Sequence, residues 1–242
     1  FERMTDRKSW GKPLSALMGA LKMQVEFGLP SIGGKDSMSG TFENINVPPM
    51  LMAFGITTVD AEKVISPELK FEGNKLYLIK HTPLDNYMPD VEQLKANWAY
   101  VHEQIEAENI VSGYALGFGG IAEAICKMSF GNGLDAKINV DEKELFNYGY
   151  GSILVEAESE LDYPNAVLVG EVTDGEDSEL TINGVKFDLF DLMAANSAKF
   201  AQVYPDTAEA YCKDVVPAGL NNVKPFKAKK ADLKYKGEPV QT

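Results

Sequence analysis

The chain has 242 residues, 45% of them hydrophobic and 24% charged, a composition typical of a folded protein rather than a disordered or collagen-like one. Its formal net charge of −13 at pH 7 argues against a general nucleic-acid binder, because phosphate attraction needs clustered Lys and Arg. No apolar run approaches the ~18 residues of a membrane helix. We therefore expect a cytoplasmic chain without a membrane or nucleic-acid partner.

The first expected element is a helix over residues 13–27, with Pro13 in its first turn and Gly28 at its end. Apolar residues recur at helical spacing within it and form one stripe: Leu14, Leu17, Met18, Leu21 and Val25. Residues 50–59 are nearly all apolar, the pattern of a strand buried on both faces. Turn-rich sequence then predicts a domain boundary near residue 70.

Beyond residue 75, expected strands and helices alternate. Asn183 and Gly184 separate two short strands and predict a hairpin, so we expect a mixed α/β sheet. The expected strands are 75–79, 111–116, 134–140, 152–156, 166–173, 180–182 and 185–187. The expected helices are 91–105, with Trp98 in the core, one that carries Ile121, Ile125 and Met128, and 191–203.

The segment Gly33–Ser39 carries the most chemistry, with two glycines, a Lys, an Asp and two Ser in seven residues. Glycines let backbone N–H groups approach phosphate oxygens, Lys35 could pair with a phosphate, and Asp36 could hold Mg²⁺. A Walker P-loop is excluded, because Asp36 rather than Ser or Thr follows Lys35 and no helix comes after it. Two interpretations stay open: a solvated turn between strands, or a phosphate or substrate loop of another kind.

Other polar and glycine-rich segments favour structural roles. Gly117–Gly120 stands where a strand meets a helix, and we favour a tight turn there over an anion site. Residues 146–152 are aromatic and glycine-rich, so they could stack a base or make a turn into a strand. The acidic clusters at 156–160 and 174–179 are expected at solvated edges.

Cysteine and histidine chemistry is also restricted. Cys126 and Cys212 form no CxxC pair, which indicates a reducing compartment and two inert thiols. His81 is expected in a loop and His102 on a helix surface, and two histidines argue against a zinc site of the usual composition.

The residues Gly34–Ser39, with a helix and a Gly-x-Pro exit before them, resemble the GKDSMS motif of the phosphoribosylformylglycinamidine synthase family, also called formylglycinamide ribonucleotide amidotransferases. Ile65–Leu69, Gly119-Gly120 and Leu145–Asn147 resemble further elements of that family. The resemblance covers about residues 10–212.

The resemblance implies an aminoimidazole ribonucleotide synthetase-like fold and the second such half of the synthetase region. Residues 1–70 would be part of an ATP- and substrate-binding subdomain. Residues 71–212 would be a complete C-terminal subdomain, and 213–242 a linker toward an absent glutaminase domain. Because the chain lacks an initiator Met, we expect a fragment that is inactive alone. Its apolar residues 50–59 would then be exposed, so we also expect self-association.

The family reaction is the ATP-dependent conversion of formylglycinamide ribonucleotide and glutamine to the amidine, a C–N ligation of purine biosynthesis. The resemblance implies ATP and Mg²⁺ as cofactors, nucleotide contacts at Gly33, Gly34 and Lys35, and substrate contacts at Ser37 and Ser39. Lys35 would act catalytically by neutralising phosphate, and Asp36 would approach the metal.

One departure from the family concerns a second, auxiliary nucleotide site. Residues 114–120 lack the Asp and Ser that hold Mg-nucleotide there in many members. We therefore do not expect this chain alone to bind the auxiliary nucleotide. Two alternatives stay open: a stand-alone nucleotide-binding module and a scaffold for a partner half.

Overall fold

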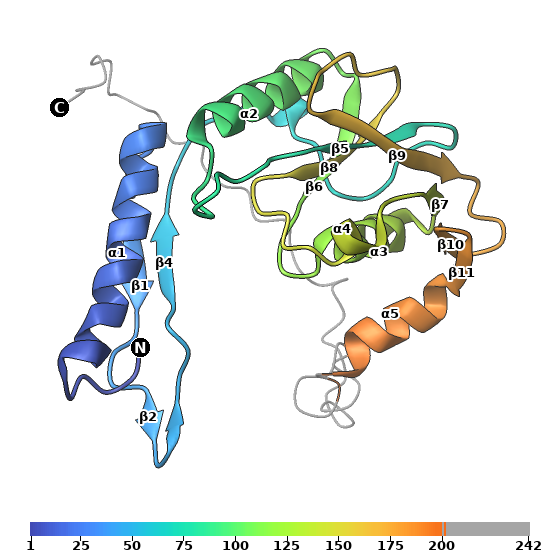
Figure 1. Cartoon of the computed structure of the whole chain (residues 1–242). Coiled ribbons are helices and arrows are strands. Elements are labelled where there is room, and N and C mark those ends of the chain that lie inside the picture. Colours follow the sequence, from blue (N-terminus) through green and yellow to red (C-terminus); the bar gives the residue numbers. More distant parts are fainter. Residues whose placement is uncertain (200, 202–242) are drawn as a thin grey trace, which may run out of the picture. The chain divides into compact units, whose positions relative to one another are not determined.

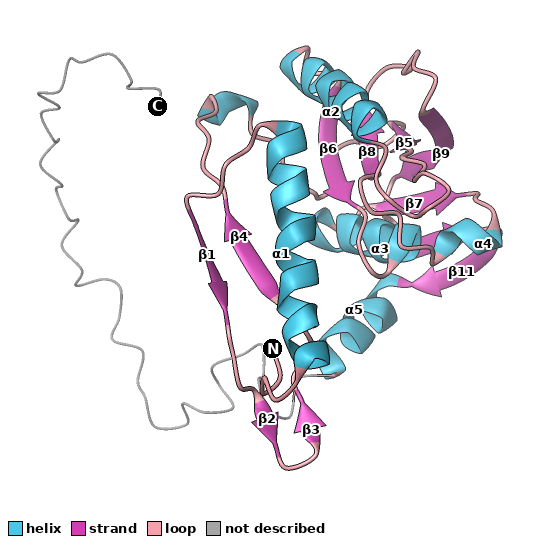
Figure 2. Ribbon diagram, turned by 60° about the vertical axis from the view of Figure 1, so that its left-hand side comes forward, coloured by secondary structure: helices cyan, strands magenta, loops and turns pink. Residues whose placement is uncertain are grey.

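The computed structural model describes residues 1–199 and 201, apart from the side chain of Asp36 (Figures 1 and 2). Phe1–Ala194 form one unit, and a second begins at Ala195. The helices are α1 (Arg7–Phe27), the short 3₁₀ turn η1 (Ala61–Lys63), α2 (Val91–Glu106), α3 (Gly120–Asn132), α4 (Glu142–Leu145) and α5 (Leu189–Ala198). No helix among the described residues is long and apolar enough to cross a membrane.

Seven strands form one mixed sheet in the order β11-β10-β7-β9-β5-β8-β6. They are β5 (Lys75–Ile79), β6 (Ile110–Ala115), β7 (Asp135–Ile138), β8 (Ile153–Ala157), β9 (Ala166–Thr173), β10 (Glu179–Ile182) and β11 (Val185–Asp188). Only β7 and β10 run parallel. The hairpin β10–β11 turns at Asn183 and Gly184, both with positive φ, as a two-residue type I′ turn requires. The prediction of a mixed α/β fold is confirmed.

Alternating side chains of the central strands divide the core between the two faces of the sheet. Leu76 and Leu78 of β5 pack with Ile125 and Met128 of α3, while Tyr77 and Ile79 pack against the other face with Val101 of α2. The helix α2 covers only part of its face. Trp98 of α2, predicted in the core, is 38% exposed. Its indole N–H instead donates to the carbonyl of Gly151 at 3.2 Å.

One acidic residue of the predicted solvated cluster 156–160 lies in the core instead. Glu156 is fully buried on β8 and accepts hydrogen bonds from the backbone N–H groups of Lys70 and Phe71 and from the side chain of Asn74, at 2.8–2.9 Å. A buried carboxylate needs such donors to replace its lost water. It thereby fixes the segment that leads into β5.

The N-terminal helix begins earlier than predicted. Asp6 caps α1 and exchanges hydrogen bonds with Ser9 in a capping box, so Pro13 lies inside the helix rather than in its first turn. The apolar stripe of this helix is 54–71% exposed. A helix face with this pattern normally packs against another surface.

The strand expected over residues 50–59 is shorter than predicted, and it is exposed, as expected of this segment in a fragment, rather than buried on both faces. Only Leu51–Phe54 of the predicted strand 50–59 form β4, and Met52 is 44% exposed. The reason is that β4 pairs with a single strand, β1 (Gly33–Asp36), in a two-stranded ribbon. The hairpin of β2 (Thr41–Phe42) and β3 (Ile45–Asn46) lies between them in sequence (Figure 2).

Several expectations can be checked only in part. The helix expected over 191–203 is present as α5, while residues 200, 202 and 203 lie outside the described chain. Cys212 and the tail 213–242 lie outside it as well. His102 is exposed, as predicted.

Candidate functional site

The first half of the Gly33–Ser39 segment is a strand rather than a loop. Gly34 and Lys35 pair with Ala53 and Met52 of β4 in antiparallel register. The backbones approach so closely that a Cβ on Gly34 would lie 2.6 Å from the carbonyl oxygen of Met52, whereas one on Gly33 would meet nothing within 4 Å. Gly34 is therefore required by strand pairing, whatever else it contacts.

At the end of the strand, the side chain of Lys35 contacts that of Ser37. The ammonium of Lys35 donates to the hydroxyl of Ser37 at 3.3 Å, and both residues are exposed. The N-terminal ammonium of Phe1 donates to the carbonyl of Ser37. Ser39 has a positive φ of 60°, which turns the chain toward β2. An exposed cation beside a hydroxyl is an arrangement that can bind an anionic group.

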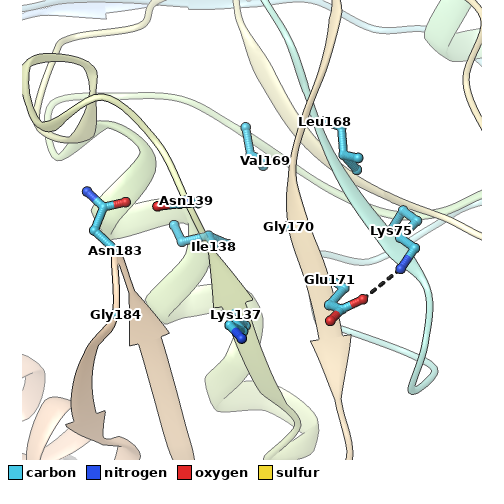
Figure 3. Close-up of a pocket in the computed structure, with 10 residues that line it drawn as sticks. All are labelled: Lys75, Lys137, Ile138, Asn139, Leu168, Val169, Gly170, Glu171, Asn183 and Gly184. Atoms are coloured by element: carbon cyan, nitrogen blue, oxygen red, sulfur yellow. Dashed lines mark hydrogen bonds and ion pairs between the residues drawn. The ribbon is translucent and has the colours of Figure 1, made fainter.

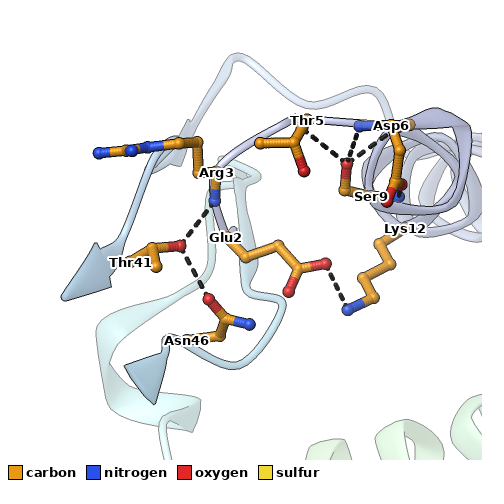
Figure 4. A network of polar contacts seen from close by, with 8 residues as sticks. All are labelled: Glu2, Arg3, Thr5, Asp6, Ser9, Lys12, Thr41 and Asn46. Atoms are coloured by element: carbon orange, nitrogen blue, oxygen red, sulfur yellow. Dashed lines mark hydrogen bonds and ion pairs between the residues drawn. The ribbon is translucent and has the colours of Figure 1, made fainter. Parts of the chain in front are cut away.

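The residues around this turn are fixed by a network of polar contacts (Figure 4). The backbone N–H of Arg3 donates to Thr41, whose hydroxyl donates to Asn46 of β3 at 2.8 Å. Lys12 of α1 forms an ion pair with Glu2 at 2.5 Å. The start of the chain is thus tied to both α1 and the β2–β3 hairpin, next to the residues that follow β1.

The described part of the chain holds no group of three His, Cys, Asp or Glu side chains placed to bind a metal ion. The side chain of Asp36, the predicted metal residue, is outside that part, and its neighbour Lys35 is a cation that repels metals.

The glycines at the start of α3 form a tight, self-capped turn, the interpretation favoured from the sequence. The backbone N–H of Gly119 donates to the carboxylate of Glu123 at 3.0 Å. Glu123 also holds Lys127 at 2.7 Å, and this ammonium is the main reason that its pKa is lowered. The position where an anion would bind is occupied by the helix's own carboxylate.

Two structural residues were not recognised in the sequence. Glu156 is one, and the run Ile153–Ala157, in which one acid interrupts apolar residues, is the signal that could have revealed it. His81 is the other: its Nδ1 donates to the carbonyl of Tyr150 and its Nε2 accepts from the N–H of Asp90. Cys126 is half-buried, and burial raises the pKa of its thiol, as an inert role requires.

A groove of about 750 Å³ lies over the uncovered part of the sheet (Figure 3). Lys75 of β5 pairs with Glu171 of β9 at 2.6 Å, and Lys137 of β7 stands opposite Glu171 in register. Alternating charges across neighbouring strands are typical of a solvated sheet face. This groove therefore requires no ligand to explain it.

Comparison with known proteins supports the resemblance. The chain is 25% identical over 202 residues to the phosphoribosylformylglycinamidine synthase subunit PurL of two strains of Lactobacillus delbrueckii subsp. bulgaricus. The alignment covers 72% of this chain and 27% of each relative, so the chain spans about a quarter of their length. No family model matches the chain.

Solved structures with similar backbones were also found. Phosphoribosylformylglycinamidine synthase II from Thermotoga maritima aligns with a TM-score of 0.46 and 13% identity, over 58% of this chain and 28% of that one. The PurLQS structure from the same organism aligns with a TM-score of 0.47 and 14% identity, over 57% of this chain and 28% of that one. The hydrogenase maturation protein HypE aligns with a TM-score of 0.41 and 13% identity, over 57% of this chain and 58% of that one. In its motif and over these 202 residues, the chain is similar to phosphoribosylformylglycinamidine synthase subunit PurL.

Proposed function

We propose that this chain supplies one part of a phosphoribosylformylglycinamidine synthase of the PurL type. The reaction would be the ATP-dependent conversion of formylglycinamide ribonucleotide and glutamine to the amidine, ADP, phosphate and glutamate. Two observations together support the proposal: the Gly33–Ser39 motif, and the similarity of the chain to PurL over 202 residues. PurL of Thermotoga maritima has been solved with ATP and with formylglycinamide ribonucleotide, which makes these the ligands to test first.

The roles proposed for the site residues are those that the family resemblance implies. ATP would activate the amide oxygen by phosphorylation, and ammonia would then displace phosphate. Lys35 would neutralise charge on the transferring phosphoryl group, since a positioned cation stabilises that transition state. Gly33 and Gly34 would let backbone N–H groups approach the nucleotide, while Ser37 and Ser39 would contact the ribonucleotide. Magnesium, carried by the nucleotide and approached by Asp36, would neutralise phosphate charge.

The N-terminal part of the chain supports a role inside a larger assembly. Among residues 1–64, apart from the side chain of Asp36, only Phe1, Ser9 and Pro13 are buried. Apolar surface on this scale marks an interaction site in a folded protein. We propose that the rest of the synthetase, on which a glutaminase domain would also act, packs on α1 and the β1–β4 ribbon. Residues 1–70 and 71–212 would be the two subdomains.

Reconstitution tests this function. The chain would be mixed with the remaining synthetase portion of a PurL-type enzyme, and amidine formation would be measured from formylglycinamide ribonucleotide, Mg-ATP and ammonium chloride. Ammonia replaces glutamine, so no glutaminase is needed. We expect turnover that requires both parts and none from either alone.

Turnover by the other part alone would contradict the proposal. A complex that forms but gives turnover unchanged by Lys35→Ala and Ser37→Ala would leave this chain as a scaffold, one of the alternatives that the sequence left open. Its exposed N-terminal surface is the observation that favours this second candidate.

A further inference from the structure

Two loops at one edge of the large sheet present a cluster of aromatic side chains to solvent. The rings of Phe118 and Tyr148 are stacked with centroids 4.9 Å apart and planes 19° from parallel. Tyr150 lies 6.2 Å from Tyr148 at a tilt of 52°. Phe118 is 73% exposed and Tyr148 55%. Exposed aromatic side chains usually occur singly on a protein surface. A cluster of three usually marks a site that contacts a ligand or another protein.

The backbone beneath the rings is held tightly. Strands β6 and β8 are antiparallel neighbours, so the residues that follow β6 and those that precede β8 lie at the same end of this strand pair. A Cβ on Gly120, whose φ is +63°, would lie 2.6 Å from the carbonyl oxygen of Asn147. A Cβ on Gly149 would lie 2.6 Å from the side chain of Leu116. Only glycine fits at Gly120, where the contact is with backbone and φ is positive, whereas the Leu116 side chain can move at Gly149. The turn that follows Phe118 is therefore held against the Asn147 backbone.

A pocket of about 150 Å³ adjoins these loops and shares Asn147 and Gly149 with them. Its polar lining includes Lys80, Thr82 and Ser152. Lys80 is paired with Glu144 at 3.4 Å, so its charge is already balanced. Pocket and rings together offer a stacking surface and hydrogen-bonding groups, without a spare positive charge.

The neighbouring charges argue against an anionic ligand. Glu123 already occupies the N–H group at the start of α3, and the carboxylate of Glu144 lines the pocket. A phosphate here would meet carboxylates rather than donors.

We propose that an outer face of the stacked Phe118–Tyr148 pair (the platform) binds an uncharged planar heterocycle of the nucleobase class, whose polar edge reaches the pocket lined by Lys80 and Ser152. Stacking of a base on an aromatic ring contributes about 1–3 kcal/mol of binding free energy per base. Rings that are already in place reduce the cost of ordering a loop on binding. The site is separate from Gly33–Ser39 in the chain and does not depend on the function proposed for that segment.

The probe is adenosine, with adenosine 5′-monophosphate as the charged comparison, both measured on the full chain by saturation-transfer NMR and calorimetric titration. Phe118→Ala and Tyr148→Ala remove one ring each. Phe190→Ala removes an exposed ring of α5 outside the platform and serves as the matched control. Lys95→Ala, a surface lysine paired with Glu92, is a second control. Thermal melts establish that each variant is folded.

We expect adenosine to bind more tightly than the monophosphate and without magnesium. Each platform variant should weaken adenosine binding at least about fivefold, the lower end of one stacking contact, while the Phe190 and Lys95 variants bind as the unaltered chain does. Absence of adenosine binding, or binding unchanged by both platform variants, would overturn the proposal. So would tighter binding of the monophosphate, since that requires an anion site.

Discussion

The backbone of Gly34 lies against that of Met52, so that a Cβ on Gly34 would be 2.6 Å from the Met52 carbonyl oxygen. The motif that resembles a nucleotide-handling loop is thus half of a strand pair. Its second glycine has a structural reason to be glycine, independent of any ligand.

Gly34→Ala should therefore open the β1–β4 pairing. Overpacking at such a contact costs about 1–3 kcal/mol, so amide hydrogen exchange at residues 33–36 should accelerate roughly five- to a hundredfold. Gly33→Ala is the matched control, because nothing lies within 4 Å of a Cβ there. Equal protection in both variants would show that the contact does not hold the ribbon.

Glu156→Gln should destabilise the sheet domain by about 3 kcal/mol. The carboxylate accepts from three N–H donors with both oxygens, and the amide would turn an NH₂ group toward at least one of them, leaving buried donors unpaired. Urea unfolding measures the loss. Glu158→Gln, at an exposed position two residues further on, should change stability by less than about 0.5 kcal/mol. A similar effect in both would exclude the proposed clamp.

Asp135→Asn should stabilise the chain at pH 7, because the amide carries no buried charge. Burial raises the pKa of Asp135, and Asp174 and Asp177 nearby add to the effect. The asparagine oxygen can still accept from the N–H of Glu179, as the carboxylate does at 2.8 Å.

The pH dependence of this variant has a definite sign. A carboxyl whose folded pKa is raised binds its proton more tightly in the folded chain, so the original protein gains stability as the pH falls through that pKa. The advantage of Asp135→Asn should shrink accordingly in melts from pH 7 to pH 4. The exposed Asp85→Asn serves as the control. An advantage that grows on acidification would contradict the assignment.

The exposed stripe of α1 should drive self-association of the isolated chain. Leu17→Gln with Leu21→Gln should shift sedimentation toward the monomer, since both side chains are more than half exposed. Lys22→Gln, on the same helix but in a surface ion pair with Glu26, should not. A concentration-independent monomer for the unaltered chain would refute the prediction.

Much of the large sheet could be predicted because its signals are local. The apolar strand 75–79 and the Asn183-Gly184 turn specify their own conformations. The N-terminal helix and strand were also predicted as elements, but their burial could not be, because burial depends on what covers them. Trp98 fits the apolar stripe of its helix, but only the fold shows that α2 places this side chain at the margin of the core, where it is partly exposed.

The conformation of the candidate segment could not be predicted from its sequence. The motif marks residues 33–39, but the pairing of Lys35 with Met52 depends on a strand that begins sixteen residues later. Glu156 was missed because its partners Lys70, Phe71 and Asn74 are more than eighty residues away in sequence.

The central claim is that this chain contributes Lys35 to a PurL-type synthetase. Its most direct test is ammonia-dependent amidine formation by the reconstituted enzyme with Lys35→Ala, compared with Lys95→Ala, a surface lysine paired with Glu92. Removal of a group that stabilises transition-state charge costs about 10²–10³ in turnover, so we predict a loss on that scale for Lys35→Ala and none for Lys95→Ala. Unchanged turnover in the Lys35 variant, with the complex still assembled, would contradict the account.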